Sequence, residues 1–178
     1  MRWTVNSERT LYHDRWVHLL AADVSAGEGR LDHRVIRSRD GASALALDRG
    51  RVLMMWRHRF ITDSWGWELP GGGIETGEDP ADAAARELEE ETGWRAAAPL
   101  LPFIRLRPLP GLSTIRHHVF RVDSATYAGP PVDGFEAERI AWVPIRDLHD
   151  LIDRGDVSEG TTLAALLRLL TVPPQEGA

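Results

Sequence analysis

Four glutamates stand within five consecutive positions of the stretch RELEEETGW, which runs from Arg86 to Trp94. On a helix, neighbouring like charges are destabilising by roughly 0.2–0.5 kcal/mol per pair. Carboxylate oxygens are also the ligands that hard divalent cations such as Mg²⁺ prefer. The cluster therefore has two interpretations, an ordinary solvated helix face or a group of acids that bind metal ions.

The spacing of the acids separates them into two sets. Glu87, Glu90 and Glu91 follow i, i+3, i+4 spacing, so their carboxylates gather on one face of a helix. Glu89 points elsewhere and is interpreted as a solvated charge. The cluster lies near the C-terminal end of the predicted helix, where the helix dipole disfavours negative charge. That placement favours a functional role over a solvated face.

The helix that must position these acids is predicted for Asp79–Thr92. Asp79 is a suitable N-cap, Pro80 suits the first helical position, and Gly93 suits the stop. At 100° per residue, one side of this helix carries the predicted core stripe, Ala81, Ala84, Ala85, Leu88 and Thr92.

A glycine-rich loop, WELPGGGIETGEDP, precedes the helix and contains Gly71, Gly72 and Gly73 in a row. Glycine lets the backbone approach a ligand closely, with carbonyls that reach a cation and amides that reach a phosphate. A plain turn is the alternative interpretation of three glycines alone. A glycine loop that returns onto an acid-lined helix favours the metal site.

These residues resemble a known motif, the Nudix box. The box specifies glycine, glutamate and the Arg-Glu-aliphatic-any-Glu-Glu-any-Gly-apolar run at fixed spacing. This chain meets each fixed position with Gly72, Glu78, Arg86, Glu87, Leu88, Glu90, Glu91, Gly93 and Trp94. Trp94 stands where an aliphatic residue is commoner. The flanking runs VLMMWRHRF, WGWELPGG and FEAERIAWVPIRDLHDLIDRGDVSEGTTLAALL resemble the ADP-ribose pyrophosphatase-like branch, so the resemblance covers about Arg34 to Leu170.

The resemblance implies a fold and a metal site. The expected fold class is α+β, a Nudix fold in which an α/β/α sandwich contains a mixed central β-sheet. The family's metal ligands correspond to Glu87, Glu90 and Glu91, with the carbonyl near Gly72, and the implied cofactor is Mg²⁺ or Mn²⁺, two or three ions with substrate bound. The arginine matching Arg86 pairs with the acid matching Glu78 in the family, which implies a structural role for both.

A catalytic base is expected outside the helix, because related enzymes take it from a loop before the last strand. The loop YAGPPVDGFEAERIAW offers Asp133, Glu136 and Glu138. Glu136, six residues before Trp142, matches the family offset best, and Glu138 is the alternative. We count Glu136 and Glu90 as the candidate catalytic residues, while solvated loop acids remain the other interpretation.

Substrate contacts are predicted from arginine and aromatic residues. Arg57 and Arg59 alternate on one strand face just before the box, and guanidinium groups suit phosphate binding. An exposed strand edge is the alternative. Trp16 is the candidate for stacking on a base, and core packing is the alternative for it and for Phe60, Trp65 and Trp67. The run LPGLS, 109–113, is either a substrate loop or a turn.

The remaining pattern predicts many strands and few helices. Apolar, β-prone runs bounded by turn residues are Trp16–Val24, Arg34–Arg37, Ser43–Leu47, Val52–Trp56, Leu100–Leu106, Ile115–Val122 and Arg139–Val143. Two further helices are predicted at Arg146–Arg154 and Thr161–Thr171. We divide the chain into an N-terminal β-rich extension (residues 1–38), a Nudix hydrolase domain (39–172) that forms a single globular unit with it, and a flexible tail (173–178).

Composition excludes several other classes of protein. The chain has 178 residues, no cysteine and a formal charge of −6. Cysteine-ligated zinc and thiol chemistry are thereby excluded, and the acidic balance argues against a nucleic-acid binder. The most apolar tract, LAALLRLLTV, is too short to span a bilayer, and a cytoplasmic protein with no membrane partner is expected. His117 and His118 are adjacent, so on a strand they face opposite ways and cannot form a same-face metal pair.

The predicted function is metal-dependent hydrolysis of the pyrophosphate bond in a nucleoside diphosphate linked to another group X. The expected products are a nucleoside monophosphate and a phosphorylated X, and ADP-ribose or a similar nucleotide-sugar is the favoured substrate. The alternatives are a (d)NTP pyrophosphohydrolase and a non-catalytic module that senses nucleotides. A homodimer is expected by analogy, because the extension of related proteins exchanges strands.

Overall fold

The computed structural model describes residues 1–132 and 136–171. The predicted tail and the candidate loop acid Asp133 lie outside the described residues. Contacts divide the chain into two units, Met1–Asp40 with Arg107–Arg116, and Gly41–Leu106 with His117–Ala178. Within the described part, no helix is both long and apolar enough to cross a membrane.

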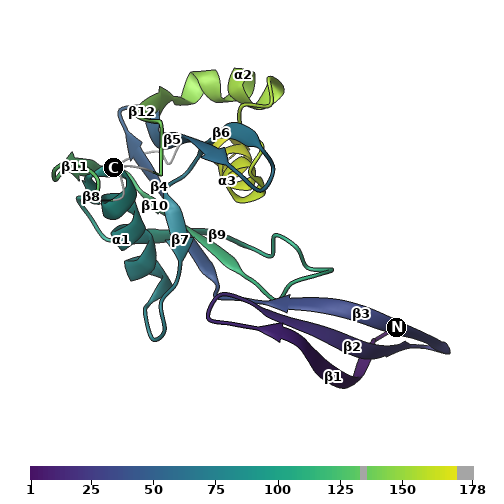
Figure 1. Cartoon of the computed structure of the whole chain (residues 1–178). Coiled ribbons are helices and arrows are strands. Elements are labelled where there is room, and N and C mark those ends of the chain that lie inside the picture. Colours follow the sequence, from purple (N-terminus) through teal and green to yellow (C-terminus); the bar gives the residue numbers. More distant parts are fainter. Residues whose placement is uncertain (133–135, 172–178) are drawn as a thin grey trace. The chain divides into compact units, whose positions relative to one another are not determined.

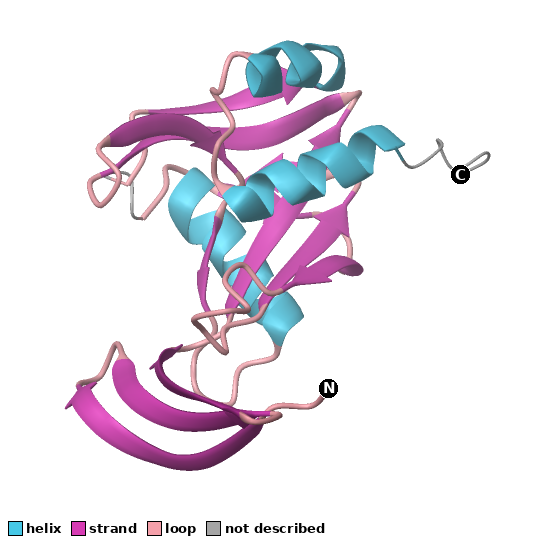
Figure 2. Cartoon of the chain, turned by 90° about the vertical axis from the view of Figure 1, so that its right-hand side faces the viewer, coloured by secondary structure: helices cyan, strands magenta, loops and turns pink. Residues whose placement is uncertain are grey.

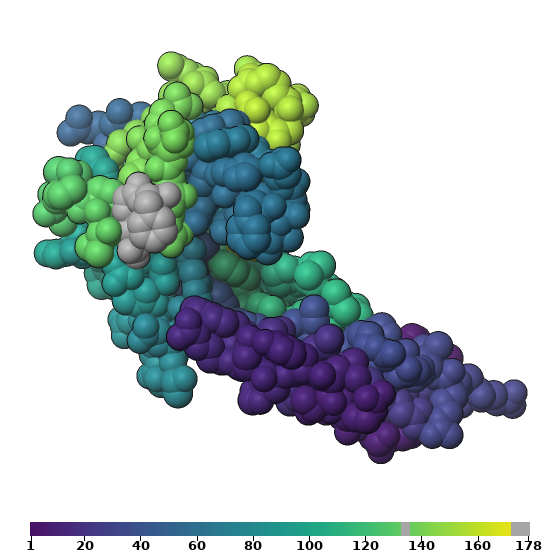
Figure 3. Space-filling model, viewed as in Figure 1, coloured from purple at the N-terminus to yellow at the C-terminus, as the bar shows by residue number. Residues whose placement is uncertain are grey.

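The first unit is a three-stranded antiparallel sheet in the order β1-β2-β3. Its strands are β1 (Thr4–His13), β2 (His18–Ala26) and β3 (Gly29–Arg37). The central strand β2 buries Leu20, Ala21, Ala22 and Val24. The side chains of β1 are exposed along the whole strand, in purple in Figure 3. The sequence pattern did not predict β1, because a strand with few buried apolar side chains lacks the alternation that marks a half-buried strand.

The segment 107–116 belongs to this first unit because it pairs with β3. The Ile36 N–H donates to the Leu112 carbonyl at 2.8 Å, and the Thr114 N–H donates to the Ile36 carbonyl at 3.2 Å. This segment contains the run LPGLS, and Leu109 accepts a bond from the Ser113 N–H at 2.7 Å, so the run is a hydrogen-bonded turn.

The second unit is built on a mixed seven-stranded sheet. Its main path is β12-β5-β4-β10-β9, with β6 paired to β5 and β7 paired to β4. β4 and β10 are parallel, and the other pairs are antiparallel. The bounds are β4 (Gly41–Asp48), β5 (Arg51–Arg59), β6 (Ser64–Glu68), β7 (Gly71–Gly73), β9 (Leu101–Leu106), β10 (His117–Val122) and β12 (Arg139–Pro144). A separate pair joins β8 (Trp94–Ala96) to β11 (Ala125–Tyr127).

Helices cover both faces of this sheet (Figures 1 and 2). They are α1 (Pro80–Thr92), the 3-10 turn η1 (Ile145–Asp147), α2 (Leu148–Asp153) and α3 (Gly160–Thr171). Successive residues of a strand face opposite ways, so Ala42, Ala44 and Ala46 pack with α1 whereas Leu45 and Leu47 pack with α3. The α+β class with a mixed central sheet between helical layers is therefore confirmed.

Most predicted elements of this unit are present, but the sequence pattern did not predict the short strands β6, β7, β8 and β11. The predicted helix Arg146–Arg154 is split into η1 and α2. β7 consists of three glycines, which have low strand propensity. It forms because it pairs with β4, Ser43 lying opposite Gly71 and Ala42 opposite Gly72, and local sequence carries no signal for that pairing.

The caps of α1 explain why the helix begins and ends at these residues. The Asp79 carboxylate accepts the Ala81 N–H at 2.8 Å. Gly93 has a left-handed φ of 74° and donates its N–H to the Glu89 carbonyl at 2.8 Å. A Cβ at Gly93 would lie 2.0 Å from the Gly129 carbonyl oxygen. The position needs glycine both for its backbone conformation and for space.

Replacement of Gly93 by alanine tests this double requirement, and Gly155 supplies the matched control. Gly155 has a similar φ of 79°, yet a Cβ there would meet nothing within 4 Å. We expect Gly155→Ala to lower the free energy of unfolding by about 1 kcal/mol, the cost of left-handed backbone. Gly93→Ala should lower it by about 1–2 kcal/mol more, because of the clash. Urea denaturation measures both, and equal losses would show that the Gly129 carbonyl moves away freely.

Candidate active site

Glu91 is the most buried acid of α1. Only 4% of its surface is exposed, whereas the side chains of Glu87 and Glu90 are 14% and 36% exposed. The sequence prediction placed Glu91 outside the core stripe, and this is wrong. The buried residues of α1 are Ala83, Ala84, Leu88, Glu91 and Thr92. Burial of this acid is tolerated because the neighbouring strands provide polar partners.

Two groups from the sheet bind the Glu91 carboxylate. Its Oε1 accepts the Arg57 Nη1 at 3.0 Å, and its Oε2 accepts the Gly71 N–H at 2.7 Å. Burial raises the pKa of Glu91 to about 8; Gly71 and Arg57 act in the opposite direction, and Glu136 raises the pKa further. Burial likewise raises the pKa of Glu87. The site thus holds carboxylates whose negative charge is poorly solvated.

Arg57 connects the helix to the loop before β12. Its second terminal nitrogen, Nη2, donates to the Glu136 carboxylate. Arg57 is only 6% exposed, and its Nε has no hydrogen-bond partner among the described residues. The Glu138 side chain is exposed, although its N–H donates to the Trp56 carbonyl at 2.9 Å. Of the two described candidate loop acids, Glu136 is therefore the one that Arg57 connects to the acid cluster.

Arg86 holds the loop and the helix together at the other end of the cluster. It donates to Glu78 at 2.9 and 3.1 Å, to Glu87 at 2.7 Å and to Glu90 at 3.0 Å. It also reaches the Gly73 carbonyl at 3.2 Å. The guanidinium lowers the pKa of Glu78. One cation thus serves three carboxylates and a backbone oxygen.

The glycine loop lies against the helix as β7. A Cβ at Gly72 would lie 2.6 Å from Oε1 of Glu87. The absence of a side chain at Gly72 thus lets the backbone approach this carboxylate closely. This contact brings Gly72 next to one of the acids that the sequence assigned to the metal.

The donor set of this site fits divalent cations. Five carboxylates and two guanidinium groups meet here, which leaves a formal excess of three negative charges. The groups belong to Glu78, Glu87, Glu90, Glu91 and Glu136 and to Arg57 and Arg86. Hard cations prefer such oxygen donors. Within residues 1–132 and 136–171, no three His, Asp or Glu side chains form a ready-made metal cage. The arginines lie between the acids instead.

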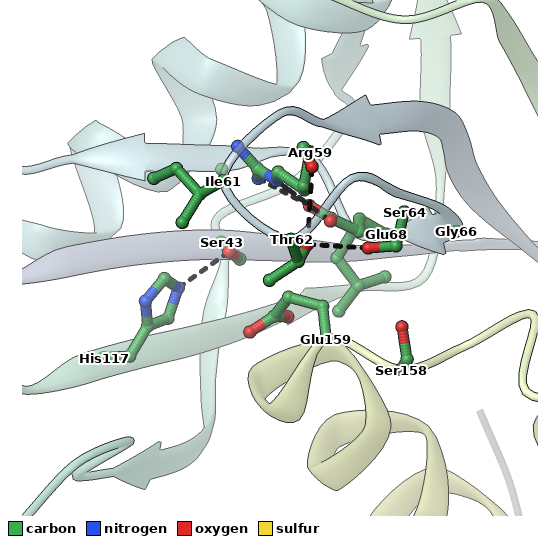
Figure 4. Close-up of a pocket in the computed structure, with 12 residues that line it drawn as sticks. Ser43, Arg59, Ile61, Thr62, Ser64, Gly66, Glu68, His117, Ser158 and Glu159 are labelled. Carbon is green, nitrogen blue, oxygen red and sulfur yellow. Dashed lines mark hydrogen bonds and ion pairs between the residues drawn. The ribbon is translucent and has the colours of Figure 1, made fainter.

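A cavity of about 630 Å³ adjoins this cluster (Figure 4). Its lining residues come from β4, the β5–β6 hairpin, β7, β10 and the start of α3: Ser43, Arg59, Ile61, Thr62, Ser64, Gly66, Glu68, Leu69, Gly71, His117, Ser158 and Glu159. Gly71 belongs both to this lining and to the acid cluster, where its N–H binds Glu91. The volume of the cavity lies in the range of small-molecule sites.

The three residues predicted to bind substrate are in different places. Arg57 lies in the acid cluster, and Arg59 lines the cavity, where its Nε donates to Glu68 at 3.0 and 3.1 Å. Trp16 belongs to the first unit; it is 56% exposed, with Arg15 and Arg39 lying 4.6 and 5.4 Å from its ring. Among the other aromatic candidates, Trp67 is buried, whereas Phe60 and Trp65 are exposed.

Sequence reasoning missed the polar residues of the cavity. Ser43 and His117 share a hydrogen bond of 2.8 Å between Oγ and Nε2, and Glu159 lines the same space. Because His117 and His118 are adjacent on a strand, the sequence showed that they face opposite sides of the sheet. It did not show which of these sides contains a cavity. Ser43 and His117 are 74 residues apart in sequence, so only the pairing of β4 with β10 brings them together.

Comparisons with known proteins agree with this arrangement. The family model described as NUDIX domain matches residues 37–166. A CMP-5'-(N-acetyl-N-hydroxy-3-aminopropyl)phosphonate hydrolase of Streptomyces rubellomurinus is 38% identical over 93% of this chain and 82% of its own length. An ADP-ribose pyrophosphatase of Bacillus subtilis is 27% identical over 90% of this chain and 88% of its own length.

A solved structure has the same fold. It is a crystal structure of an ADP compounds hydrolase, with a TM-score of 0.81, 20% sequence identity, and coverage of 96% of this chain and 93% of that one. This likeness concerns the fold, and it confirms the expected sandwich architecture.

The raised pKa of Glu91 predicts how stability depends on pH in metal-free protein. A carboxyl whose pKa rises from 4.5 to about 8 on folding stabilises the fold fully below its unfolded pKa. That contribution is lost as pH rises through 8. With a chelator present, Glu91→Gln should therefore become more stable relative to wild type as pH rises from 5 to 8.5. Urea denaturation measures the free energy of unfolding of both proteins across this range.

The control for this comparison is Glu89→Gln. Glu89 is an acid of the same helix, paired with Arg95 at 2.6 Å, and that pairing lowers its pKa. The free energy of unfolding of Glu89→Gln should therefore not increase relative to that of wild type as pH rises. A pH-independent difference for Glu91→Gln would mean that Arg57 and Gly71 keep Glu91 ionised throughout.

Proposed function

Because the chain belongs to the NUDIX domain family and is a pyrophosphohydrolase of its ADP-ribose pyrophosphatase-like branch, we propose that it hydrolyses a nucleoside diphosphate linked to a group X. The products are a nucleoside monophosphate and a phosphorylated X. ADP-ribose or a similar nucleotide-sugar is the favoured substrate. The observation that carries this proposal is the buried, over-charged acid cluster beside a cavity large enough for a small group.

Glu87, Glu90 and Glu91, with the Gly72 carbonyl, are proposed to bind two or three Mg²⁺ or Mn²⁺ ions together with the substrate. Such ions, when bound, spread the charge of the pyrophosphate and lower the pKa of a coordinated water. The excess of negative charge and the burial of Glu91 support this role, because a desolvated carboxylate gains most from a nearby cation.

The chain's own residues hold these groups in position. Arg86 ties Glu78 and the Gly73 carbonyl to the helix, which fixes the glycine loop over the acids. Arg57 holds the loop acid Glu136 toward Glu91. We assign Glu136 to receive a proton from the attacking water, and Glu90, the most exposed of the three helix acids, to assist it.

Arg57 and Arg59 are proposed to contact the substrate near its phosphates, and Trp16 to stack on its base. Both arginines pair with carboxylates in the structure. Their role toward phosphate therefore requires that bound cations compensate those carboxylates. The first unit, with the exposed strand β1, is proposed to form a homodimer.

The test of the proposed function is a screen of nucleoside diphosphate compounds with identified products. The set includes ADP-ribose and other nucleotide-sugars, a CMP-linked phosphonate of the kind that the Streptomyces relative's name describes, and nucleoside triphosphates. Hydrolysis should require Mg²⁺ or Mn²⁺ and stop with EDTA, and it should release a nucleoside monophosphate. Binding of these compounds without turnover would favour a nucleotide sensor. Hydrolysis of triphosphates alone would favour a (d)NTP pyrophosphohydrolase.

Glu91→Gln separates catalysis from folding. The variant keeps the size of the side chain but loses its charge, so turnover should fall about a hundredfold or more. The free energy of unfolding at pH 7.5 should change far less. Glu89→Gln, on the same helix but outside the cluster, should keep the turnover and the free energy of unfolding of wild type. Parallel losses of turnover and stability in Glu91→Gln would make the cluster structural.

A further inference from the structure

We propose that Ser43 and His117 are positioning residues for the acid cluster, and that they hold the glycine strand β7 at the place that Glu91 requires. Both act through Gly71, which contacts Ser43 on one side and donates its N–H to Glu91 at 2.7 Å on the other. The inference rests on the proposed function, because it assigns a support behind the same reacting centre.

Ser43 and His117 form a polar pair on the cavity side of the sheet. Ser43 is only 6% exposed, and its Oγ shares a hydrogen bond of 2.8 Å with the His117 Nε2, which Figure 4 shows as a dashed line. Burial lowers the pKa of His117, so the ring is neutral at pH 7. Apolar groups of the same shape can replace such a neutral pair at almost no cost in stability. The pair therefore calls for a role besides stability.

The His117 ring lies over a glycine, which gives the ring its place. His117 on β10 is paired with Gly41 on β4, and a Cβ at Gly41 would lie 2.6 Å from the His117 Nδ1. The ring thus occupies the space that a side chain of Gly41 would fill. From there its Nε2 reaches Ser43, which is two residues further along β4 and on the same face. The imidazole thereby fixes the direction of the Ser43 hydroxyl.

Ser43 in turn lies against the backbone of β7. A Cβ at Gly71 would lie 2.0 Å from the Oγ and 2.7 Å from the Cβ of Ser43. The Ala44 N–H donates to the Pro70 carbonyl at 3.0 Å, so the alternation of an antiparallel ladder makes Ser43 and Gly71 a non-hydrogen-bonded pair. Facing residues approach most closely in such a pair. The Ser43 side chain therefore sets how near Gly71 comes to β4.

The same pairing directs the Gly71 N–H away from β4, where Glu91 accepts it. Glu91 is a proposed metal ligand, and Gly72, the next residue of β7, supplies the proposed carbonyl ligand. Groups of a functional site have to be held within about 0.5 Å of their working geometry. A displacement of β7 would misplace both ligands at once, so the contact of Ser43 with Gly71 controls the site from behind.

Amide hydrogen exchange at Gly71 in metal-free protein tests this positioning. Ser43→Ala removes the hydroxyl, and His117→Phe keeps a ring but breaks the hydrogen bond. Both should speed exchange at Gly71 by about tenfold or more, as measured by NMR at pH 7, because the bond to Glu91 loses its support. His117→Gln can still place an amide near the position of Nε2, and it should restore most of the protection.

The affinity for Mn²⁺ in the absence of substrate tests the link to the acid cluster. Replacing the partners that support metal ligands typically costs about 10–100-fold in affinity or activity. The dissociation constant of Mn²⁺, from the EPR signal of the free ion, should therefore rise about tenfold in Ser43→Ala and His117→Phe. In His117→Gln it should stay close to that of wild type.

Thr10→Val is the matched control, because it breaks a bond of the same kind, 2.8 Å between the Thr10 Oγ1 and the His18 Nε2 in the first unit. It should change neither exchange at Gly71 nor the affinity for Mn²⁺. Urea denaturation shows that each variant is folded and measures its free energy of unfolding.

Three results would overturn the positioning role. They are wild-type exchange at Gly71 in both disruptive variants, an equal rise in exchange at all amides of β4 and β10, and faster exchange at Gly71 with unchanged affinity for Mn²⁺. Failure of wild type to bind Mn²⁺ and to hydrolyse any nucleotide would overturn the proposed function instead. The exchange at Gly71 needs neither metal nor turnover, so it separates the two failures.

Discussion

The arrangement depends on compensating negative charge that is partly removed from water. α1 presents Glu87, Glu90 and Glu91 along one side, and the third of these is almost completely buried. A buried carboxylate without a partner would be costly. The sheet and loops provide Arg57, Arg86 and the Gly71 N–H, which reduce the cost without matching the charge. We propose that bound cations compensate the residual excess, whereas in metal-free protein burial, and to a smaller extent Glu136, keep the pKa of Glu91 high.

The fold supplies these partners from segments that are far apart in the sequence. Arg57 is 34 residues from Glu91 and 79 residues from Glu136. β5 carries Arg57 next to α1, and the antiparallel pairing of β12 with β5 places the loop before β12 at the same end. β7 brings Gly71 and Gly72 against the helix because it pairs with β4, which packs beneath α1 through its alanines. Small residues at these contacts allow the backbone to approach the acids.

Local signals predicted the helix and the motif, whereas burial and the cavity required the three-dimensional structure. The cap at Asp79, the stop at Gly93 and the spacing of the glutamates are short-range features, and they gave α1 its correct bounds. The burial of Glu91 could not be predicted, because it depends on Arg57 and Gly71 reaching the same carboxylate. The Ser43–His117 contact depends on the parallel pairing of β4 with β10, which a sequence pattern does not encode. Glu159 resembles an ordinary helix cap until α3 is placed beside these strands.

The alternation of β4 explains how one short segment serves two purposes. Ala42 and Ala44 face α1 and its acids, whereas Ser43 faces the cavity on the side of α3. Gly71 lies opposite Ser43 and reaches both sides, with its N–H on Glu91 and its Cα against the Ser43 hydroxyl. The acid cluster on the side of α1 and the cavity on the side of α3 are thereby separated by one layer of backbone. Substitutions on the α3 side, away from Ser43 and His117, can therefore change the lining of the cavity while the acid cluster, supported from the other face, keeps its geometry.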